Sequence, residues 1–529
     1  MLANNEGRSV DTFLVEPVNS KAHRDLYEAR KKIHPKRARG NFRTLKWWVM
    51  IVTLGIYYIT PWLRWDRGPH APDQAVLVDL ANARFHFFFI EIWPQEFFFV
   101  AGLLVMAGIG LFLITSTVGR AWCGYTCPQT VWVDLFLVVE RAIEGDRNAR
   151  IKLDAAPMSL AKVLKRVSKH TVWLLIAVAT GGAWIFYFAD APTLLRDLFT
   201  GNAAFVAYAT VAVLTFTTYT FGGLLREQVC TYMCPWPRIQ AAMLDEHSLT
   251  VTYNDWRGEP RSRHTKRARA EGRPVGDCVD CNACVVVCPM GIDIRDGQQL
   301  ECITCALCID ACDGVMSKLG LEKGLISYTT LGQYDANMMK SGARRATIDG
   351  EQRWDATQID VDKVRPDTGK LSEAFNLTGI ASILRPRTAV YLAIWCALGL
   401  GLLTALLLRD RLDLNVRHDR NPLFVLLSNG DVRNGYEVKI LNMMPKPRRF
   451  VFTVEGLPGA AMTVAGDDAV PAKKLIVSVK PDQLRNLKVF VRVPRREIRA
   501  SRQSFNFVAK EIGGTETATY SARFESPKE

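Results

Sequence analysis

The 529-residue sequence predicts a multi-domain membrane protein with five transmembrane α-helices, a cysteine-rich insert and a C-terminal β-sandwich. Three observations carry this prediction. Five apolar stretches approach the roughly 20 residues that a bilayer-spanning helix needs. Eight of the thirteen cysteines fall in one short region between the fourth and fifth stretches. After the fifth stretch, apolar and polar residues alternate with the period of β-strands.

The five expected spans form the framework of the chain. Aromatic residues at the ends of the first span, including Trp47 and Trp62, suit the boundary between lipid and water. The first four spans pair into two hairpins, and the fifth stands alone after the insert. We expect the spans at residues 47–62, 97–118, 172–188, 203–221 and 389–408.

Basic residues in the flanking loops predict the orientation of the spans. Lys and Arg collect before the first span and between the second and third, whereas the loops after the first and third spans carry few. This pattern places the N-terminus and the insert in the cytoplasm and the C-terminal tail outside. The polar N-terminal segment shows no cleavable signal peptide, so the first span is expected to stay as an anchor. We therefore assign most of the net charge of +14 to membrane topology and not to nucleic-acid binding.

These spans divide the chain into five segments. Residues 1–46 form a basic cytoplasmic segment, and residues 47–221 form the two transmembrane hairpins. Residues 222–387 form a cytoplasmic region, with its cysteine-rich part at about 270–320. The fifth transmembrane helix covers residues 388–408, and an exported β-domain covers residues 409–529.

Two cysteine runs in the insert carry the strongest chemical signal. CVDCNACVVVC and CITCALCIDAC share the spacing C-x2-C-x2-C-x3-C, which wraps thiolates around a 4Fe-4S cluster as in bacterial ferredoxins. Zinc sites use separated pairs of ligands, and a reducing cytoplasm disfavours disulfides. Pro289 follows the first run but Asp313 follows the second, so we expect the two local turns to differ. Because the fourth cysteine of each run crosses to the other cluster in two-cluster ferredoxins, the expected ligands are Cys278, Cys281, Cys284 and Cys312 (the cluster-1 set) and Cys302, Cys305, Cys308 and Cys288 (the cluster-2 set).

Four further cysteines occur in two C-x3-C-P motifs, WCGYTCPQT and CTYMCPWPR. Each motif follows a hairpin of two spans, and such repeats often place a functional site at their shared interface. The proline predicts a helix start, where a thiol tends towards the thiolate form. Converging thiolates favour Cu(I), zinc or iron–sulfur, whereas the alternative is that they only pack the helix junctions. We predict a metal or redox role for Cys123, Cys127, Cys230 and Cys234.

The segment after residue 409 contains alternating runs such as RRFVFTV and LKVFVRV, separated by turn signals. This pattern predicts an antiparallel β-sandwich of immunoglobulin-like type. The segment holds no cysteine and no catalytic constellation. A module that docks a partner and a purely structural cap are both open interpretations.

The combined motifs resemble one family. GRAWCGYTCPQTVWVDLF, CTYMCPWPRIQAAMLDEHSL and the paired ferredoxin runs are similar to the CcoG/FixG/RdxA family of accessory proteins for cbb3-type cytochrome c oxidase, over nearly the whole chain. The resemblance implies a cupric reductase of the bacterial inner membrane that supplies Cu(I) for the copper centre of the oxidase. It also implies two 4Fe-4S clusters, copper at the four C-x3-C-P cysteines, and partners among copper chaperones and oxidase subunits or assembly factors.

Two alternatives stay open at this point. One is a quinol-linked membrane electron conduit similar to the NapH-like proteins, against which the exported β-domain counts. The other is a non-enzymatic assembly scaffold whose clusters only hold the insert folded. The sequence leaves the cytoplasmic electron donor unidentified and the oligomeric state open, with a homodimer as one option.

Overall fold

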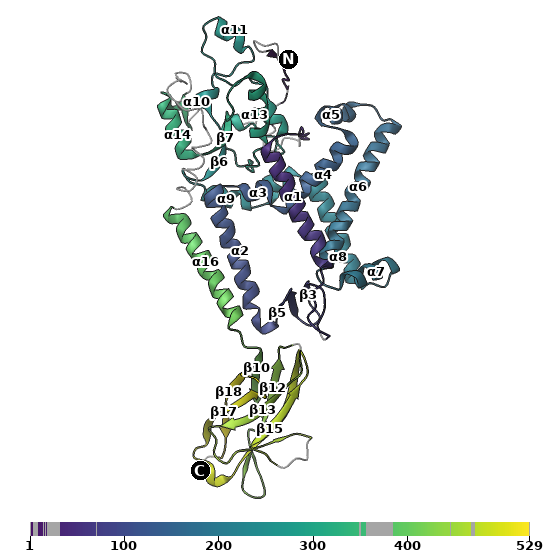
Figure 1. Cartoon of the computed structure of the whole chain (residues 1–529), viewed down its shortest axis with the longest axis vertical. Helices are drawn as coiled ribbons and strands as arrows, with labels where there is room; N and C mark the ends of the chain where they lie inside the picture. The colour runs from purple at the N-terminus through teal and green to yellow at the C-terminus, as the bar shows by residue number, and fades with distance from the viewer. Residues whose placement is uncertain are drawn as a thin grey trace. The chain divides into compact units, whose positions relative to one another are not determined.

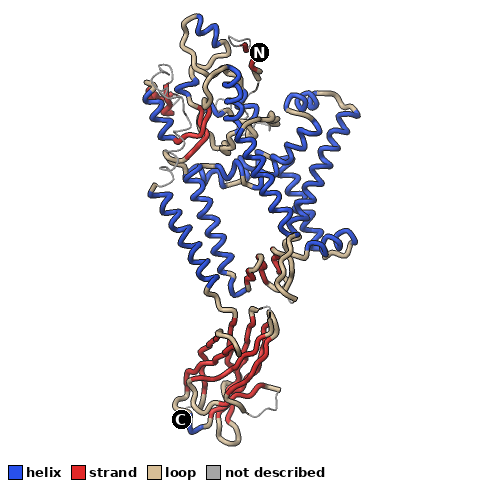
Figure 2. Tube along the Cα trace, in the orientation of Figure 1, coloured by secondary structure: helices blue, strands red, loops and turns tan. Residues whose placement is uncertain are grey.

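The computed structural model describes residues 2–3, 9–13, 15, 17, 32–69, 71–348, 351–355, 385–444, 446–466 and 471–527 (Figure 1). Parts of the expected segments 1–46 and 222–387 lie outside these residues. Helices dominate the first part of the chain, and long strands follow the last helix (Figure 2). This change of secondary structure agrees with the change of periodicity near residue 409.

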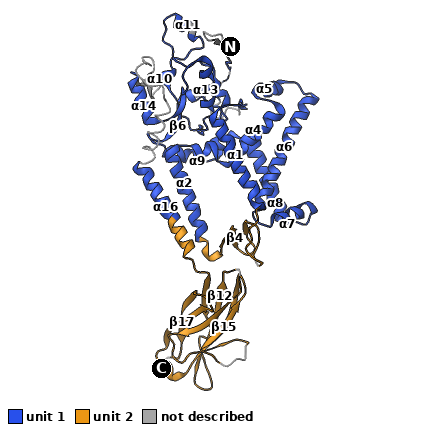
Figure 3. Cartoon of the chain, in the orientation of Figure 1, with its two compact units in different colours: residues 1–62, 98–399 blue, residues 63–97, 400–529 orange. Residues whose placement is uncertain are grey.

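Two compact units divide the chain (Figure 3). Unit 1 comprises residues 1–62 and 98–399, and unit 2 comprises residues 63–97 and 400–529. Each unit is therefore assembled from two separate stretches of sequence.

A long helix lies at each of the five positions where the sequence predicts a span. By length and composition, three helical stretches in the described part of the chain could cross a membrane: Pro94–Val118, Phe205–Leu225 and Pro386–Leu407. These apolar helices indicate a membrane protein, while the number of five spans stays a prediction. The five helices are α1 (Asn41–Ile59), α2 (Phe98–Val118), α6 (Leu160–Ile185), α8 (Phe205–Thr218) and α16 (Pro386–Leu407).

Short helices carry both C-x3-C-P motifs. Pro128 is the first residue of the helix that follows the first motif, and Pro235 is the N-cap of the helix that follows the second motif. Both prolines therefore start helices, as the sequence predicts. The second motif follows one set of π-helical turns and begins inside another, which sequence periodicity does not reveal. The elements are α3 (Ala121–Tyr125), α4 (Pro128–Glu144), α5 (Arg147–Ala155), α7 (Ala191–Thr200), η4 (Tyr219–Leu225), η5 (Val229–Met233) and α9 (Trp236–Met243).

The iron–sulfur region of unit 1 combines a small sheet with short helices. Strands β6 (Leu249–Tyr253) and β7 (Ile326–Thr330) pair antiparallel, and both cysteine runs lie between these two strands in the sequence. The remaining elements of this part are α10 (Asp255–Gly258), α11 (Thr265–Ala270), α12 (Ala283–Val287), η6 (Ile294–Asp296), α13 (Leu307–Leu319), α14 (Leu331–Lys340) and the hairpin of β8 (Arg344–Ile348) with β9 (Glu351–Asp355).

Unit 2 contains a sandwich of two antiparallel sheets, as the alternating pattern predicts. One sheet has the order β10-β12-β16-β14, with β11 pairing β12, and the other has the order β15-β13-β17-β18. The ring of Tyr436 in the first sheet packs against the ring of Phe507 in the second, with 5.2 Å between the two ring centroids. The strands are β10 (Leu412–His418), β11 (Val425–Leu426), β12 (Val432–Asn442), β13 (Arg448–Glu455), β14 (Ala461–Val464), β15 (Lys474–Val479), β16 (Gln483–Val493), β17 (Arg502–Glu511) and β18 (Thr517–Glu525).

The segment between α1 and α2 docks on the sandwich within unit 2. This segment forms the sheet of β3 (Val76–Asp79), β4 (Arg84–Phe87) and β5 (Ile90–Ile92). Arg84 Nη2 donates to the carbonyl of Asp482 at 2.6 Å, and Arg409 Nη1 donates to the carbonyl of Glu91 at 2.7 Å. The two stretches therefore belong to one compact unit, and the side of a membrane that this unit occupies stays a prediction.

Tyr436→Phe is expected to destabilise the sandwich by about 1 kcal/mol. The ring is fully buried, and its hydroxyl donates to the carbonyl of Arg523 at 2.6 Å. The substitution keeps the packing but removes this donor, so thermal unfolding of the purified protein in detergent should occur at a lower temperature. Tyr520→Phe, at a partly buried position of β18, is the control and should change the free energy of unfolding by less than ~0.5 kcal/mol. Equal losses in both variants would contradict the assigned hydrogen bond.

Candidate iron–sulfur and thiol site

The two cysteine runs fold into matching loops. Asp280 and Asn282 in the first run adopt φ angles of 48° and 58°, and Thr304 and Ala306 adopt 49° and 58° at the equivalent positions of the second. Positive φ is uncommon for residues other than glycine, so its repetition marks a defined backbone path. Turns of this kind can point successive N–H groups into a concavity that suits anions, including iron–sulfur cores.

The fourth cysteine of each run lies at a helix, and the two helices end differently. Helix α12 ends at Val287, directly before Cys288 and Pro289. Helix α13 instead continues past Cys312, and Asp313 accepts a hydrogen bond from the backbone N–H of Gly324 at 2.9 Å. Asp313 is therefore accommodated because the second helix does not stop at the cysteine. The expected difference between the two turns is confirmed.

The structure groups the eight cysteines across the two runs. Burial, followed by the charges of Cys284, Cys278 and Cys281, raises the pKa of Cys312 well above its usual range. Burial and the charges of Cys305 and Cys302 likewise raise the pKa of Cys288 to about 12. Cys312 thus lies near three cysteines of the first run, and Cys288 lies near two cysteines of the second run. None of the eight forms a disulfide, and this donor set fits two 4Fe-4S clusters.

The four C-x3-C-P thiols come together from the two hairpins. Burial, followed by the charges of Cys127, Cys123 and Cys234, raises the pKa of Cys230 to about 12. The Cys123 thiol donates to Gln240 Oε1 at 3.1 Å, and this contact joins the first motif to α9 after the second motif. The structure therefore brings together all four cysteines that the sequence singles out.

The helix-start argument for thiolate character concerns the second cysteine of each motif, and the first cysteines lie in a different setting. Burial raises the pKa of Cys123 to about 11, although the guanidinium of Arg120 opposes this effect. Cys127 caps α4, whereas Cys123 lies one helix earlier and Cys230 lies inside η5. The helix-start argument therefore does not extend to Cys123 and Cys230, where burial outweighs the neighbouring cation.

The first thiols of the two motifs, Cys123 and Cys230, lie against the cluster-2 set. Cys123 belongs to a buried cluster that contains Cys305 and packs against Cys230, Cys288 and Cys302. The Tyr125 hydroxyl within the first motif donates to the carbonyl of Cys305 at 3.3 Å. The cluster-1 cysteines belong instead to a second buried cluster, centred on the sheet of β6 and β7. The order is therefore cluster-1 set, cluster-2 set and C-x3-C-P thiols.

Gly124→Ala is expected to displace the first motif from the cluster-2 loop. A Cβ atom at this position would lie 2.7 Å from the Ile303 carbonyl oxygen and 3.0 Å from Cys305 Cα, and backbone atoms cannot rotate away. We expect a loss of iron and of visible absorbance in the purified protein. Gly314→Ala in α13 is the control, because a Cβ there meets no atom within 4 Å. Full iron content in the Gly124 variant would show that this contact is not needed.

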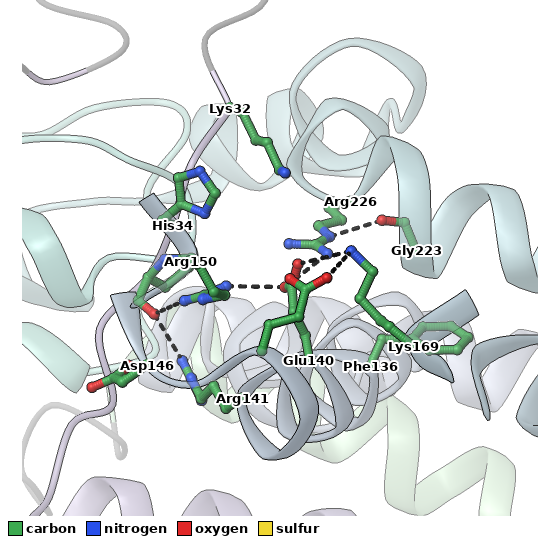
Figure 4. Close-up of polar contacts among 12 residues, drawn as sticks. Lys32, His34, Phe136, Glu140, Arg141, Asp146, Arg150, Lys169, Gly223 and Arg226 are labelled. Atoms are coloured by element: carbon green, nitrogen blue, oxygen red, sulfur yellow. Dashed lines mark hydrogen bonds and ion pairs between the residues drawn. The ribbon is translucent and has the colours of Figure 1, made fainter. Parts of the chain in front are cut away.

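A buried network of ion pairs lies close to the C-x3-C-P motifs (Figure 4). Glu140 of α4 accepts hydrogen bonds from Arg150 Nη1 at 3.0 Å and from Arg226 Nη2 at 2.9 Å, and Lys169 Nζ lies 3.6 Å from its other oxygen. Burial alone would raise the pKa of Glu140, but Arg226, Arg150 and Lys169 hold it below its usual range. The network ties α4, α5 and α6 to Arg226, which precedes Cys230 by four residues.

Sequence reasoning missed this network. Arg150 and Lys169 were assigned to loop charges that set the topology, although both are buried. A signal was present, because Glu140 and Glu144, together with Asp134, place three acids in the largely apolar segment QTVWVDLFLVVERAIEG. Such buried acids require partners.

Parts of the chain match known protein families. Residues 225–331 match a family described as a 4Fe-4S dicluster domain, and residues 98–144 match one described as a 4Fe-4S binding domain. The second of these matches contains Cys123 and Cys127. Residues 402–527 match the IG-like fold at the C-terminal of FixG.

Three curated proteins are similar over most of their length. Nitrogen fixation protein FixG of Rhizobium meliloti is 64% identical over 502 residues, covering 95% of this chain and 94% of that protein. Protein RdxB of Cereibacter sphaeroides is 53% identical over 465 residues, covering 86% and 90%. Protein RdxA of the same organism is 52% identical over 441 residues, covering 83% and 86%.

Among solved structures, a FixG-related protein from Vibrio parahaemolyticus matches 22% of this chain and 97% of its own. Its sequence identity is 20% and its TM-score is 0.19.

Proposed function

Because the chain belongs to the CcoG/FixG/RdxA family, we propose that it reduces Cu(II) to Cu(I) for the copper centre of cbb3-type cytochrome c oxidase. The family and its 4Fe-4S domains support an iron–sulfur oxidoreductase in oxidase assembly. Copper as the substrate, and copper chaperones or oxidase subunits as the acceptors of Cu(I), belong to our proposal.

One observation carries the copper proposal: soft thiols from both hairpins converge beside the cluster-2 set. Cu(I) prefers thiolate ligands to oxygen, and Cys123 packs in the same buried cluster as Cys305 and Cys230. When bound, the two 4Fe-4S clusters supply single electrons, and one electron converts Cu(II) to Cu(I). Transfer of this electron to copper needs the thiols to lie close to the cluster-2 cysteines, as Cys123 and Cys230 do.

The residues around the thiols prepare them for copper. The pKa values of about 11 for Cys123 and about 12 for Cys230 keep both thiols protonated at neutral pH, so copper binding releases their protons. Arg120 favours the resulting thiolate, and Gln240 orients the Cys123 thiol. We expect the four thiols to hold copper as a transient substrate.

We place this chemistry at the cytoplasmic edge of the bacterial inner membrane. The division into units supports this placement, because the segment 63–97 belongs with the C-terminal β-domain and the cysteine runs belong to the other unit. With five spans and an inside N-terminus, the β-domain is periplasmic.

An anaerobic experiment tests the proposed reaction. The clusters of the purified protein are reduced, Cu(II) is added, and cluster reoxidation is followed in the visible spectrum while a Cu(I)-specific chelator reports the product. We expect Cu(I) to form in step with reoxidation. The same result is expected for Cys396→Ala, because Cys396 is exposed on α16 and lies outside the site. Clusters that stay reduced with copper present would favour a quinol-linked conduit or an assembly scaffold.

A further inference from the structure

Within the basic stretch 261–273, the described side chains of Arg261, Arg263, Arg267 and Arg273 form a positively charged surface that we call the basic face. This stretch contains six Lys or Arg residues against one glutamate. Arg267 and Arg273 are strongly exposed, with 80% and 61% of their side chains accessible, and Arg261 and Arg263 are partly exposed. The sequence alone assigns these charges to membrane topology, but the structure places them at the iron–sulfur region.

The basic face is attached directly to the loop of the cluster-1 set. The backbone N–H of Ser262 donates to the carbonyl of Cys278 at 3.2 Å. Arg263 Nε donates to Asp280 at 2.8 Å, and Asp280 lies between Cys278 and Cys281 in sequence. The exposed arginines are therefore held beside the cysteines that are most distant from the C-x3-C-P thiols in the order found above.

Local acids do not neutralise the basic face. Glu271 is shared by Arg267 at 2.7 Å and Arg273 at 2.6 Å, and Asp280 is shared by Arg263 and Arg295, each at 2.8 Å. Glu259 lies 3.9 Å from Arg261, so three carboxylates face four exposed arginines and Arg295. Exposed pairs of this kind are weak and exchange readily with other partners. A surplus of positive charge thus faces solvent.

We propose that the basic face docks a small, acidic, one-electron carrier protein, which delivers electrons at the cluster-1 set. Complementary charge steers such encounters and accelerates association. The reduced carrier loses one electron and this chain gains it, and no bond forms or breaks. The inference rests on the iron–sulfur relay of the proposed function, but not on copper as the acceptor.

A membrane surface is a less suitable occupant of this face. Figure 1 shows α11 at the end of unit 1 away from α2 and α7, whereas a lipid-binding patch would be expected beside the membrane-crossing helices. Lipid binding also would not require the contact between residues 261–273 and the Cys278 loop. Both observations favour the carrier protein.

The test uses the full-length protein in detergent, without copper, and plant-type 2Fe-2S ferredoxin as an acidic carrier. Its Kd is measured by calorimetry at about 20 mM and about 200 mM salt. Its rate of electron delivery is measured by stopped flow. We expect Arg267→Glu with Arg273→Glu to weaken binding about tenfold or more at low salt and to slow reduction in parallel. Both effects should shrink at high salt, and the chemically reduced spectrum should stay unchanged.

A matched control carries the same charge change on the β-domain. Arg417→Glu with Arg502→Glu replaces two exposed arginines, 78% and 73% accessible, that also pair with carboxylates. This variant should bind ferredoxin like the wild type. An equal loss in both double variants, or no loss in the Arg267 and Arg273 variant, would overturn the docking proposal.

Two further readouts separate the competing explanations. Weaker binding to phosphatidylglycerol vesicles with unchanged ferredoxin binding would assign the basic face to the membrane and overturn the carrier. Copper reduction by chemically pre-reduced protein should be the same in the Arg267 and Arg273 variant as in the wild type. That assay can fail without affecting ferredoxin binding, so failure of the copper proposal and failure of the docking proposal are distinguishable.

Discussion

Replacement of all four C-x3-C-P cysteines by serine is expected to abolish copper binding and to leave the iron content unchanged. In the proposed function the four cysteines Cys123, Cys127, Cys230 and Cys234 provide the soft ligands, and serine hydroxyls do not replace them for Cu(I). The cluster-2 cysteines lie next to these thiols but are not substituted. Copper and iron are measured on the same purified samples after anaerobic loading with Cu(I).

The iron measurement decides between two roles of these thiols. Two 4Fe-4S clusters correspond to about eight iron atoms per chain, and we expect this value in the wild type and in the four-serine variant. A wild-type content of about twelve that falls to about eight would show that the motifs hold a third cluster. That outcome would fit the 4Fe-4S match over residues 98–144 and would contradict the copper assignment. Cys396→Ser is the control and should lose neither metal.

Glu140→Gln is expected to destabilise unit 1 by about 3–5 kcal/mol. The Glu140 side chain is 1% exposed, and it faces Arg150, Arg226 and Lys169. Glutamine keeps the shape but removes the negative charge, so buried cations lose their compensation. The unfolding midpoint in denaturant, measured on the purified protein in detergent, should fall accordingly.

Two comparisons make this prediction specific. Asp73→Asn removes the carboxylate of an exposed pair with Arg64, 2.7 Å apart, and should cost less than ~1 kcal/mol. Adding Arg150→Met to Glu140→Gln should restore part of the lost stability, because one uncompensated cation is removed as well. A Glu140 variant as stable as the Asp73 variant would show that the network does not hold the helices together.

The helices and the sandwich could be predicted because each depends on local pattern. Long apolar runs and two-residue alternation are visible without knowledge of any partner. The boundaries were less accurate where packing decides them. Helix α6 begins at Leu160, well before the expected span at 172–188, because its charged first turns bury Lys169 against Glu140 and Glu144. The fourth expected span continues into the π-helical turns of η4, which no apolar count reveals.

Contacts between distant segments could not be predicted in the same way. The spacing of the runs indicated which cysteines belong to which set, but it gave no sign that Gly124 packs on Cys305. The docking of β4 on the sandwich depends on Arg84 reaching the carbonyl of Asp482. Nor could the basic run at 261–273 be assigned to the Cys278 loop, because charge composition is the same for a solvated tail and for an attached surface.

The crossing of Cys288 and Cys312 has a consequence for biosynthesis. In the expected sets each fourth cysteine comes from the other run, so the cluster-2 set is complete only once Cys308 has left the ribosome and the cluster-1 set only once Cys312 has. By then α1, α2, α6 and α8 have been made, whereas α16 and the whole sandwich have not. The cellular machinery that inserts iron–sulfur clusters therefore first meets a finished site on a nascent chain whose last hydrophobic helix is still to come.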